Sequence, residues 1–363
     1  MRILVLTSRY TATRDIIDED FGRQTRLFTS LKKLKNDIDF LCADYKKYQN
    51  KNTKLHGINV FIRPFGISYF FSFIKGLSVL LKKKKYNFLI ATSDPLWGII
   101  GYFAAKRHKT KFVYDLHDNY ETYSTYKIPF LGLLHKYVVK HADTITTVSH
   151  TLKNKIKKVR KDNVFVVQNG VDIKLFRSLN KEKCRKSLNL PKNAKIIAYA
   201  GSIQRLQGIN TLIDAFKKLK KSVKTLKLVV AGRFFKGEEK YIHLNQEGII
   251  YLKSLNQDKV PELINAADVV VVPNLENAFT KYCFPYKVVE YMACNKPIVA
   301  TNVGDVGILL RKHKEVLCRP NDKKDMMDKI KGQLNKKNIS YRKDALQNSW
   351  DNIAKNLNKV LKQ

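Results

Sequence analysis

Short apolar runs alternate with longer segments of helical period along the whole chain, and this alternation constrains the fold more than any other feature. Each run is about as long as one buried strand and is bounded by turn-forming residues. Strands that alternate with helices form parallel sheets covered on both faces, so the pattern predicts a doubly wound α/β architecture. The runs are "RILVLTS", "IDFLCA", "INVFIR", "FLIATS", "KFVYDLH" and "TITTVS", followed later by "KIIAYAGS", "LKLVVAG", "GIIYL", "DVVVVPN" and "KPIVATN".

The alternation restarts after a Lys- and Asn-rich stretch near residues 177 to 194, which predicts two doubly wound domains. We place these domains at residues 1–172 and 173–345. A closing segment at 346–363 has apolar residues at helical spacing and should pack on an apolar surface. In open parallel sheets the ligand binds outside the carboxyl ends of the strands, so we expect the site in a cleft across which the two domains face each other.

The chain carries 69 Lys and Arg against 31 Asp and Glu, a formal net charge of +38. This charge attracts nucleic acid, anionic lipid and phosphorylated ligands alike, and does not choose among them. The five cysteines are scattered and odd in number, which fits a reducing compartment and indicates neither a disulfide framework nor a zinc site. The first residues run straight into a strand without the features of a signal peptide, which favours a cytoplasmic protein.

The stretch "FGISYFFSFIKGLSVLL", residues 65–81, is the best candidate for contact with a membrane. It is interrupted by Lys75 and is shorter than the roughly 20 apolar residues that a membrane span needs. In one interpretation it lies on a membrane surface, with the lysines of the following run at 82–85 facing anionic headgroups. The interpretation that we favour is a buried helix packed on a sheet, because a strand-like run follows at once, as in an αβ unit.

"YAGSIQRLQGINTLIDAF" predicts a strand, a turn at Gly201 and Ser202, a loop containing Arg205, and a helix from Gly208 or Ile209. A glycine turn that opens onto a helix exposes backbone N–H groups and the positive end of the helix dipole, which suits a phosphate. The glycine spacing matches neither a Walker loop nor a dinucleotide fingerprint. A simple structural turn remains the alternative.

"KFVYDLHDNYE" ends a strand at His117 and Asp118, with two further acids beside them. A His at the carboxyl end of a strand faces the expected site and can hydrogen-bond a substrate or assist proton movement. The alternative is a purely structural His. Metal binding has little support, because the other His residues show no matching spacing.

"FPYKVVEYMA" predicts a helix that starts at a Pro and carries Lys287 and Glu290 three residues apart, on one face. The Glu290 carboxylate lies near the helix start and can accept hydrogen bonds from ligand hydroxyls, such as a ribose diol. The alternative is an i,i+3 ion pair between the two side chains.

In this order the motifs resemble glycosyltransferase family 4, the retaining nucleotide-sugar transferases with two Rossmann-like domains known as the GT-B fold. The resemblance spans nearly the whole chain and is most specific from Asn169 to Asp305. It implies transfer of a sugar from a nucleoside diphosphate donor, no required metal or other cofactor, and a closing helix that returns to the first domain. The matching stretches are "HADTITTVSHTLK", "NGVDIKLF", "YAGSIQRLQGINTLIDAF", "LKLVVAG", "VPELINAADVVVVPN", "FPYKVVEYMACNKPIVATNVGD" and "SWDNIAKNL".

The resemblance also implies roles for individual residues. The leaving diphosphate is stabilised by a basic side chain with backbone amides, Glu290 holds the donor ribose, and His117 lies beside the transferring sugar. Lys287 is a candidate second cation. The predicted residues are His117, Asp118 and Arg205 for catalysis, Gly201, Ser202, Arg205, Lys287, Glu290, Tyr286 and Glu276 for the donor, and Gly22 and Arg23 for the first loop near the acceptor and diphosphate.

The sequence departs from the family pattern at three places. Tyr282 stands where a second acid normally engages the sugar hydroxyls, and Glu276 or the backbone at 284–286 is the candidate substitute. Gln207 replaces the usual Lys before the glycine of the phosphate loop. The first loop has one glycine where the family has two.

The function that we expect is a retaining glycosyltransferase at the inner, cytosolic face of the membrane, acting on a glycan or lipid-linked acceptor in polysaccharide or glycoconjugate synthesis. We expect an anionic membrane surface as a partner and no nucleic acid. A basic nucleic-acid-binding protein is the first alternative, but the sequence contains no helix-turn-helix, zinc finger or RNA-recognition signature. The others are a nucleotide-sugar epimerase of the same fold and a transferase that has lost activity.

Overall fold

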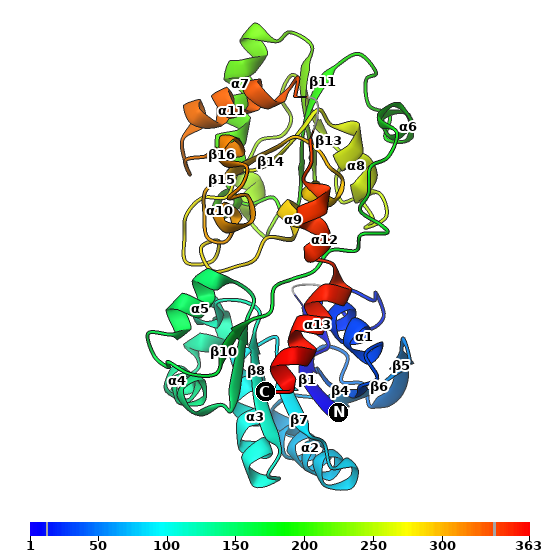
Figure 1. Ribbon diagram of the computed structural model, residues 1–363, viewed down its shortest axis with the longest axis vertical. Helices are drawn as coiled ribbons and strands as arrows, with labels where there is room; N and C mark the ends of the chain where they lie inside the picture. The colour runs from blue at the N-terminus through cyan, green and yellow to red at the C-terminus, as the bar shows by residue number, and fades with distance from the viewer. Residues whose placement is uncertain (12–13, 337–338) are drawn as a thin grey trace. The chain divides into compact units, whose positions relative to one another are not determined.

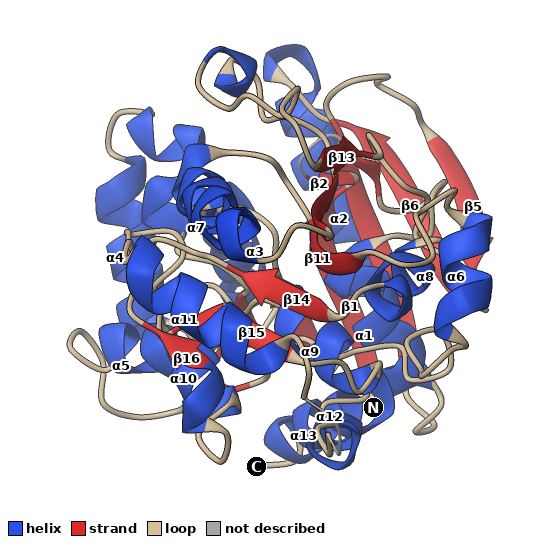
Figure 2. Cartoon of the chain, turned by 90° about the horizontal axis from the view of Figure 1, so that it is seen from above, coloured by secondary structure: helices blue, strands red, loops and turns tan. Residues whose placement is uncertain are grey.

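The computed structural model describes residues 1–11, 14–336 and 339–363. The chain divides into two compact units, an N-terminal unit of Met1–Gly170 with Trp350–Gln363, and a C-terminal unit of Val171–Ser349. Strands and helices alternate in both (Figure 1; Figure 2). The sequence analysis divided the chain after residues 172 and 345, and the structure divides it after 170 and 349.

The N-terminal unit contains an eight-stranded sheet whose strands are parallel except for the antiparallel pairing of its edge strand β5. A two-stranded antiparallel ribbon, β2 (Tyr10–Thr11) and β3 (Arg14–Asp15), follows the first strand. In spatial order the sheet consists of β10 (Val164–Val166), β9 (Thr144–Thr147), β8 (Lys111–Leu116), β7 (Phe88–Ala91), β1 (Arg2–Ser8), β4 (Asp37–Asp44), β6 (Ile58–Pro64) and β5 (Lys51–Leu55).

Helices cover both faces of this sheet because successive strand residues point to opposite sides. On one face, Val5 and Val113 belong to a buried cluster with residues of the first and last helices. On the other face, Phe112 lies against Gly101, where an added Cβ would come within 3.0 Å of its ring. The helices are α1 (Gly22–Lys32), η1 (Ile67–Tyr69), α2 (Phe70–Lys84), α3 (Pro95–Arg107), η2 (Tyr120–Thr122), η3 (Ser124–Lys127), α4 (Leu131–His141), α5 (His150–Ile156) and α13 (Trp350–Leu361).

The closing helix α13 lies beside α1 in the N-terminal unit (Figure 1). Ile353 and Leu357 of α13 join Leu27 and Phe28 of α1 in the buried cluster. The helical spacing of the apolar residues in the tail therefore reflects one buried face, as the sequence pattern indicated.

The C-terminal unit contains a six-stranded parallel sheet. In spatial order its strands are β13 (Ile249–Tyr251), β12 (Leu226–Ala231), β11 (Lys195–Ala200), β14 (Val269–Val272), β15 (Ile298–Thr301) and β16 (Leu317–Cys318). The helices are α6 (Lys181–Ser187), η4 (Arg205–Gln207), α7 (Ile209–Ser222), η5 (Glu238–Lys240), α8 (Val260–Ala266), α9 (Tyr286–Ala293), α10 (Val306–Leu309), η6 (Lys314–Val316), α11 (Lys323–Gln333) and α12 (Arg342–Gln347). Two doubly wound units confirm the predicted fold class.

Candidate functional site

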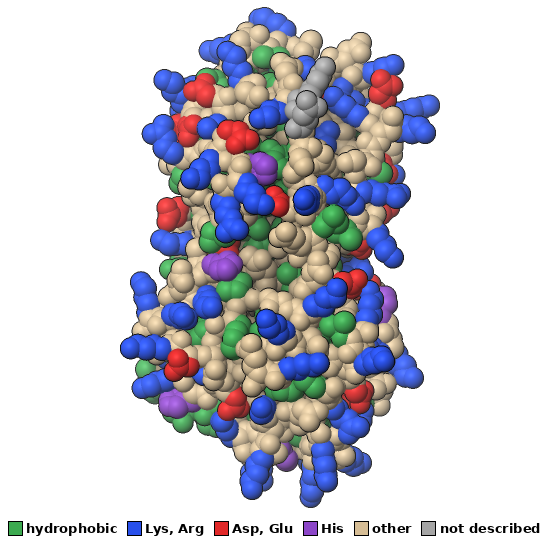
Figure 3. All heavy atoms as spheres, viewed as in Figure 1, with side chains coloured by type: hydrophobic (Ala, Val, Ile, Leu, Met, Phe, Trp, Pro, Cys, Tyr) green, Lys and Arg blue, Asp and Glu red, His purple; other side chains and the backbone are tan. Residues whose placement is uncertain are grey.

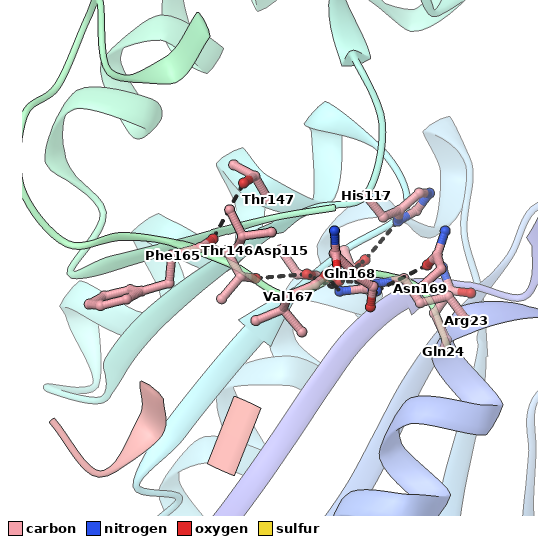
Figure 4. A network of polar contacts seen from close by, with 12 residues as sticks. Arg23, Gln24, Asp115, His117, Thr146, Thr147, Phe165, Val167, Gln168 and Asn169 are labelled. Carbon is pink, nitrogen blue, oxygen red and sulfur yellow. Dashed lines mark hydrogen bonds and ion pairs between the residues drawn. The ribbon is translucent and has the colours of Figure 1, made fainter. Parts of the chain in front are cut away.

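A network of polar contacts in the N-terminal unit centres on Arg23, in the first turn of α1 (Figure 4). Nε and one terminal nitrogen donate to the two carboxylate oxygens of Asp115 on β8, at 3.1 and 3.0 Å. The remaining N–H groups donate to the carbonyls of Val167 and Gln168, both at 2.8 Å, and to Oδ1 of Asn169 at 3.0 Å. All five donors of the guanidinium are thus used within the unit.

The prediction that Arg23 serves the acceptor or the diphosphate is therefore corrected. The residue is only 3% exposed, and its guanidinium has no donor left for a ligand. Burial raises the pKa of Asp115, but the charge and hydrogen bonds of Arg23 outweigh burial and hold this pKa below its ordinary value. Arg23 fastens α1 to β8 and to the chain at 167–169, and so positions the carboxyl edge of the sheet.

His117 follows β8 directly, and its hydrogen bonds determine which ring nitrogen carries the proton. Nδ1 lies 3.0 Å from Oγ1 of Thr92 and 3.3 Å from the hydroxyl of Tyr120. Thr92 donates its proton to the Asp115 carboxylate and Tyr120 donates its own to the Asp115 carbonyl, each at 3.1 Å. Because both hydroxyl protons are committed elsewhere, Nδ1–H must be the donor, and Nε2 keeps its lone pair. Nε2 has no hydrogen-bond partner in the described parts of the chain.

The pKa values of His117 and Asp118, at the end of β8, are shifted from their ordinary values. Burial lowers the pKa of His117 to about 4, more than the nearby Asp115 raises it, so the ring is neutral near pH 7. Burial raises the pKa of Asp118 to about 6, although its oxygens accept from the Asn119 amide at 2.8 Å and the Tyr123 hydroxyl at 3.3 Å. The strand end thus offers a neutral hydrogen-bond acceptor and a carboxyl group that titrates near neutral pH.

Gly22 begins α1 in a left-handed conformation, φ 94°, which favours glycine. The neighbouring Gln24 donates from Nε2 to Oγ of Ser93 at 3.1 Å, which joins the start of α1 to the end of β7. The predicted first-loop glycine therefore lies at the same sheet edge as His117. Its proximity to an acceptor stays a prediction.

The chain turns sharply at Gly201 after β11, in the C-terminal unit. The Gly201 amide donates to the carbonyl of Ala231 at 2.9 Å and extends the sheet. Contrary to the prediction, it is therefore not free to bind a phosphate. The amide of Ser202 makes no hydrogen bond with any described residue, and the Ser202 carbonyl accepts from the Tyr199 hydroxyl at 2.6 Å. Of the two predicted amides, only that of Ser202 remains for a ligand.

Gly208 precedes α7 with φ 72°, and a Cβ there would lie only 1.8 Å from the carbonyl oxygen of Pro273. Glycine therefore lets the chain after β14 lie directly against the start of α7. The carboxyl ends of β11 and β14 thus lie close to the positive end of this helix dipole.

The side chain of Lys287, on α9, extends to the Gly201 turn. Its ammonium donates to the Tyr199 hydroxyl at 3.0 Å and to Oε1 of Gln207 at 2.9 Å, and lies 4.5 Å from the centroid of the Tyr199 ring. A Cβ on Gly201 would come within 2.4 Å of the Lys287 Cε, so glycine makes room for the lysine. Burial lowers the pKa of Lys287 to about 8. Gln207, which stands where the family has a Lys, here orients a lysine from another helix.

Glu290 lies one turn further along α9, but within the described residues it forms no ion pair with Lys287, whose ammonium donates to Tyr199 and Gln207 instead. Burial raises the pKa of Glu290 to about 7, although the charge of Lys287 lowers it. Its carboxyl oxygens have no hydrogen-bond partner within residues 1–11, 14–336 and 339–363. The i,i+3 ion pair is therefore not the reason for this spacing, and the acid is available to a ligand.

Arg205 of η4 is half exposed and already has an anionic partner. Its amide and Nε both contact Oε2 of Glu238, at 2.9 and 3.2 Å, and its guanidinium lies 3.7 Å from the centroid of the Tyr241 ring. The predicted principal cation is thus partly neutralised by Glu238, whereas the ammonium of Lys287 donates hydrogen bonds to neutral groups alone in the part of the chain that the structure describes.

The other predicted donor residues lie in the segment before α9. Glu276 pairs with Lys281 at 3.1 Å and is more than half exposed. Tyr286 is the first residue of α9, and Tyr282 is half-buried in the preceding turn. The replacement of the acid missing at Tyr282 by Glu276 or by the backbone at 284–286 stays a prediction, as does the role of Tyr286 at the donor.

Sequence reasoning missed the neutral groups that support the site, Tyr199 and Gln207 around Lys287 and Thr92 and Tyr120 around His117. Tyr199 carried a signal, since it stands two residues before the glycine turn in a strand, and Gln207 was noted only as a departure from the family pattern. Across the described ranges, no three His, Cys, Asp or Glu side chains come together as a metal site, and no helix is long and apolar enough to cross a membrane.

Two family models match the chain. The model described as "Glycosyltransferase Family 4" matches residues 25–175, and the model described as "Glycosyl transferases group 1" matches residues 180–357. An uncharacterized glycosyltransferase of Methanocaldococcus jannaschii is 25% identical over 346 residues, covering 92% of each chain. The capsular polysaccharide biosynthesis glycosyltransferase CapM of Staphylococcus aureus is 25% identical over 325 residues, covering 85% of this chain and 83% of CapM.

Among solved structures, the Anabaena protein Alr3699/HepE in complex with UDP superposes with a TM-score of 0.77 at 18% identity, covering 100% of both chains. The two doubly wound units and these similarities define a glycosyltransferase of the GT-B class. The chain belongs to glycosyltransferase family 4, and the prediction of an enzyme of this family is confirmed.

Proposed function

We propose that the chain transfers a sugar from a nucleoside diphosphate sugar to a glycan or lipid-linked acceptor, with retention at the anomeric carbon, in the synthesis of a cell-surface polysaccharide. One observation carries the donor assignment: the ammonium of Lys287 lies against the glycine turn, on the same helix as an acid, Glu290, that has no partner among the described residues. UDP in the complex of the structurally similar Anabaena protein supports a nucleotide ligand, and the name of CapM supports a polysaccharide product.

In this proposal the diphosphate binds at the Ser202 amide and the start of α7, within reach of Lys287. Negative charge builds on the diphosphate as the bond to the sugar breaks, and a positioned cation and amide stabilise that charge more than the ground state. Because Lys287 sits among neutral partners, its full charge is available for this purpose. Arg205 forms an ion pair with Glu238 and lies over the Tyr241 ring. Its terminal nitrogens make a secondary contribution to binding the diphosphate.

We assign Glu290 to the ribose diol and His117 to a hydroxyl of the transferred sugar. A carboxylate with both oxygens unpaired accepts two hydroxyl donors well. The unprotonated Nε2 of His117 likewise accepts a hydroxyl donor, and its low pKa keeps it an acceptor throughout the neutral range. Asp118, whose pKa is about 6, is the group beside it that can exchange a proton near neutral pH.

The proposal includes no metal ion, because Lys287 and the Ser202 amide supply the positive charge. We expect turnover to survive treatment with EDTA. Loss of turnover that is restored by added Mg²⁺ or Mn²⁺ would contradict this part of the proposal.

We further propose that the enzyme works at the inner face of a membrane. The charge of +38 supports attraction to an anionic leaflet, since each basic residue near such a surface contributes about 1 kcal/mol. Figure 3 shows Lys and Arg side chains spread over the visible face with few acids among them, rather than gathered in one stripe. A dispersed charge of this kind favours a surface of lipid headgroups over a nucleic-acid groove.

A panel of nucleotide sugars tests the proposed reaction. The protein is incubated with each donor, and release of the nucleoside diphosphate is measured with the configuration of the released or transferred sugar. We expect slow turnover of one donor with retained configuration. Conversion of the donor to its epimer without release of nucleotide would indicate the epimerase alternative, and no turnover of any donor would contradict the enzyme assignment.

The titration of Glu290 and Lys287 predicts a narrow pH optimum for nucleotide binding. Glu290 must be ionised to accept the ribose hydroxyls, so affinity should fall as the pH drops below its pKa of about 7. Lys287 must be protonated, so affinity should also fall above its pKa of about 8. Glu290→Ala should weaken nucleotide binding by roughly 1–3 kcal/mol and abolish the fall in affinity at low pH. Calorimetric titration with UDP and GDP across this pH range measures both effects. An unchanged affinity in a folded Glu290→Ala variant would contradict the assignment of Glu290 to the ribose.

A further inference from the structure

Two segments of the N-terminal unit expose large apolar side chains. In η1 and the start of α2, Ile67 is 100% exposed and Phe71 is 84% exposed. In the loop before α4 and its first turn, Phe130 is 76% exposed and Leu133 is 66% exposed. We call these segments, residues 67–71 and 128–134, the two apolar tips. The sequence analysis favoured burial of the first, and the structure buries only its later part, at Phe73, Leu77 and Leu81.

Phe130 combines this exposure with an unfavourable backbone. Its φ is 62° and its ψ is −11°, in the left-handed region that bulky residues rarely adopt. The backbone of Phe130 starts α4, since its carbonyl accepts from the Leu134 amide at 3.1 Å, but the unit gains nothing from an aromatic ring held out in solvent. Strained residues of this kind cluster at functional sites. Burial of the ring in an apolar phase would supply the missing stabilisation.

The two tips lie at the same edge of the sheet. Both α2 and the segment before α4 follow parallel strands, so they begin at the carboxyl edge, the edge that carries His117. Each is fastened near the start of α3: Phe73 packs on Trp97, and Thr125 donates to Oδ2 of Asp94 at 3.1 Å. Figure 1 shows α2 and α4 on either side of α3.

The segments of the chain that contain the tips carry charges of one sign. Lys75, Lys127 and Lys136 are exposed and form no ion pair with any residue that the structure describes. Residues 65–84 and 122–142 contain no Asp or Glu at all. Exposed aromatic and aliphatic side chains flanked by unpaired lysines suit the interface of an anionic bilayer, where apolar groups insert and lysines meet the headgroups. The core of a protein–protein interface is instead depleted of lysine.

We propose that the two apolar tips dock the enzyme on an anionic lipid bilayer and hold the carboxyl edge of the N-terminal sheet at the membrane surface. This inference rests on the proposed function for its purpose, which is to bring His117 to a lipid-linked acceptor. Its physical content is separate, since the tips lie outside the residues assigned to donor and sugar.

Co-sedimentation with vesicles tests the docking surface. The vesicles contain phosphatidylcholine with phosphatidylglycerol at about one lipid in three, and a second set contains phosphatidylcholine alone. The tip variant combines Ile67→Ser, Phe71→Ser, Phe130→Asn and Leu133→Ser; Asn tolerates the left-handed backbone at position 130. The control variant combines Val159→Ser and Phe235→Ser, which remove exposed apolar side chains elsewhere in the chain.

A second pair of variants tests the contribution of charge. The charge variant combines Lys75→Gln, Lys127→Gln and Lys136→Gln. Its control combines Lys217→Gln, Lys218→Gln and Lys221→Gln on α7.

We expect the wild type and both controls to bind the anionic vesicles, and the tip variant to bind roughly tenfold more weakly. The charge variant should lose most of its preference for anionic over neutral vesicles. Equal sedimentation of the tip variant and wild type, or no sedimentation of the wild type, would overturn the proposal. So would a wild-type dimer that the tip variant converts to a monomer, because the tips would then bind a second copy.

Hydrolysis of the sugar donor in solution separates this inference from the proposed function. The tip variant should retain the donor hydrolysis of the wild type, since none of its four positions belongs to the site. If the wild type hydrolyses no donor yet sediments through the tips, the proposed function fails and the docking surface stands. If donor turnover is normal and sedimentation does not depend on the tips, the docking surface fails alone.

Discussion

Lys287→Ala should lower kcat by roughly 10²–10³-fold and change the stability of the protein little, because we propose that the lysine supplies the main charge at the leaving diphosphate. Its ammonium is the cation held against the Gly201 turn, and among the described residues its hydrogen-bond partners are the neutral Tyr199 and Gln207. Loss of a group that acts mainly on the transition state reduces turnover more than ground-state affinity. The kcat for the accepted donor, compared with the Kd of the intact donor sugar, measures this difference.

Two matched pairs of variants test whether the effect on kcat is specific to Lys287. Lys217→Ala removes an exposed lysine from α7 and should leave kcat unchanged. Gly201→Ala should reduce kcat although the lysine is still present, because the new Cβ would displace the Lys287 side chain, whereas Gly332→Ala meets nothing within 4 Å. A Lys287→Ala enzyme with wild-type kcat would show that the leaving group is stabilised elsewhere, with Arg205 as the first candidate.

Arg23→Ala should destabilise the N-terminal unit by about 3–5 kcal/mol, the usual effect of leaving one partner of a buried ion pair alone. Asp115 would keep its charge in a buried site without the guanidinium that lowers its pKa. Urea unfolding followed by tryptophan fluorescence measures this unit selectively, since both tryptophans, Trp97 and Trp350, belong to it.

Arg26→Ala on the same helix is the matched control for Arg23. Arg26 is partly exposed and pairs with Asp20 at 3.4 Å, so its loss should change stability by at most about 1 kcal/mol. The depressed pKa of Asp115 means that its contribution is present at neutral pH and is lost as the pH falls through the lowered value. The wild type should therefore lose more stability on acidification than Arg23→Ala does. Equal stability of Arg23→Ala and Arg26→Ala would contradict the structural role of Arg23.

The fold was predictable because its signal is local. The alternation of apolar runs with helical segments places strands and helices in order, and parallel strands then bring their carboxyl ends to one edge. For the same reason the sequence placed His117 at the end of β8 and the Gly201 turn at the end of β11.

The pairing of side chains was not predictable, because it joins residues that are distant in sequence. Arg23 meets Asp115 across 92 positions, and Arg205 meets Glu238 across 33. Helical spacing alone suggested a pair between Lys287 and Glu290. In the structure the lysine donates to Tyr199 instead, 88 positions away, and the acid has no partner among the described residues. Which neighbour a long side chain selects depends on the strands packed beside its helix, and no local pattern encodes that choice.

Thermal unfolding in the presence of UDP or GDP tests most directly the claim that the C-terminal unit holds a nucleoside diphosphate. A ligand that binds only the folded protein stabilises it, by about 2.7 kcal/mol at a concentration one hundred times its Kd. We predict that one of the two nucleotides raises the Tm of the wild type, that the corresponding nucleoside without phosphates does so far less, and that Glu290→Ala reduces the shift. If neither nucleotide changes the Tm of the wild type, the donor site described for Ser202, Lys287 and Glu290 is wrong.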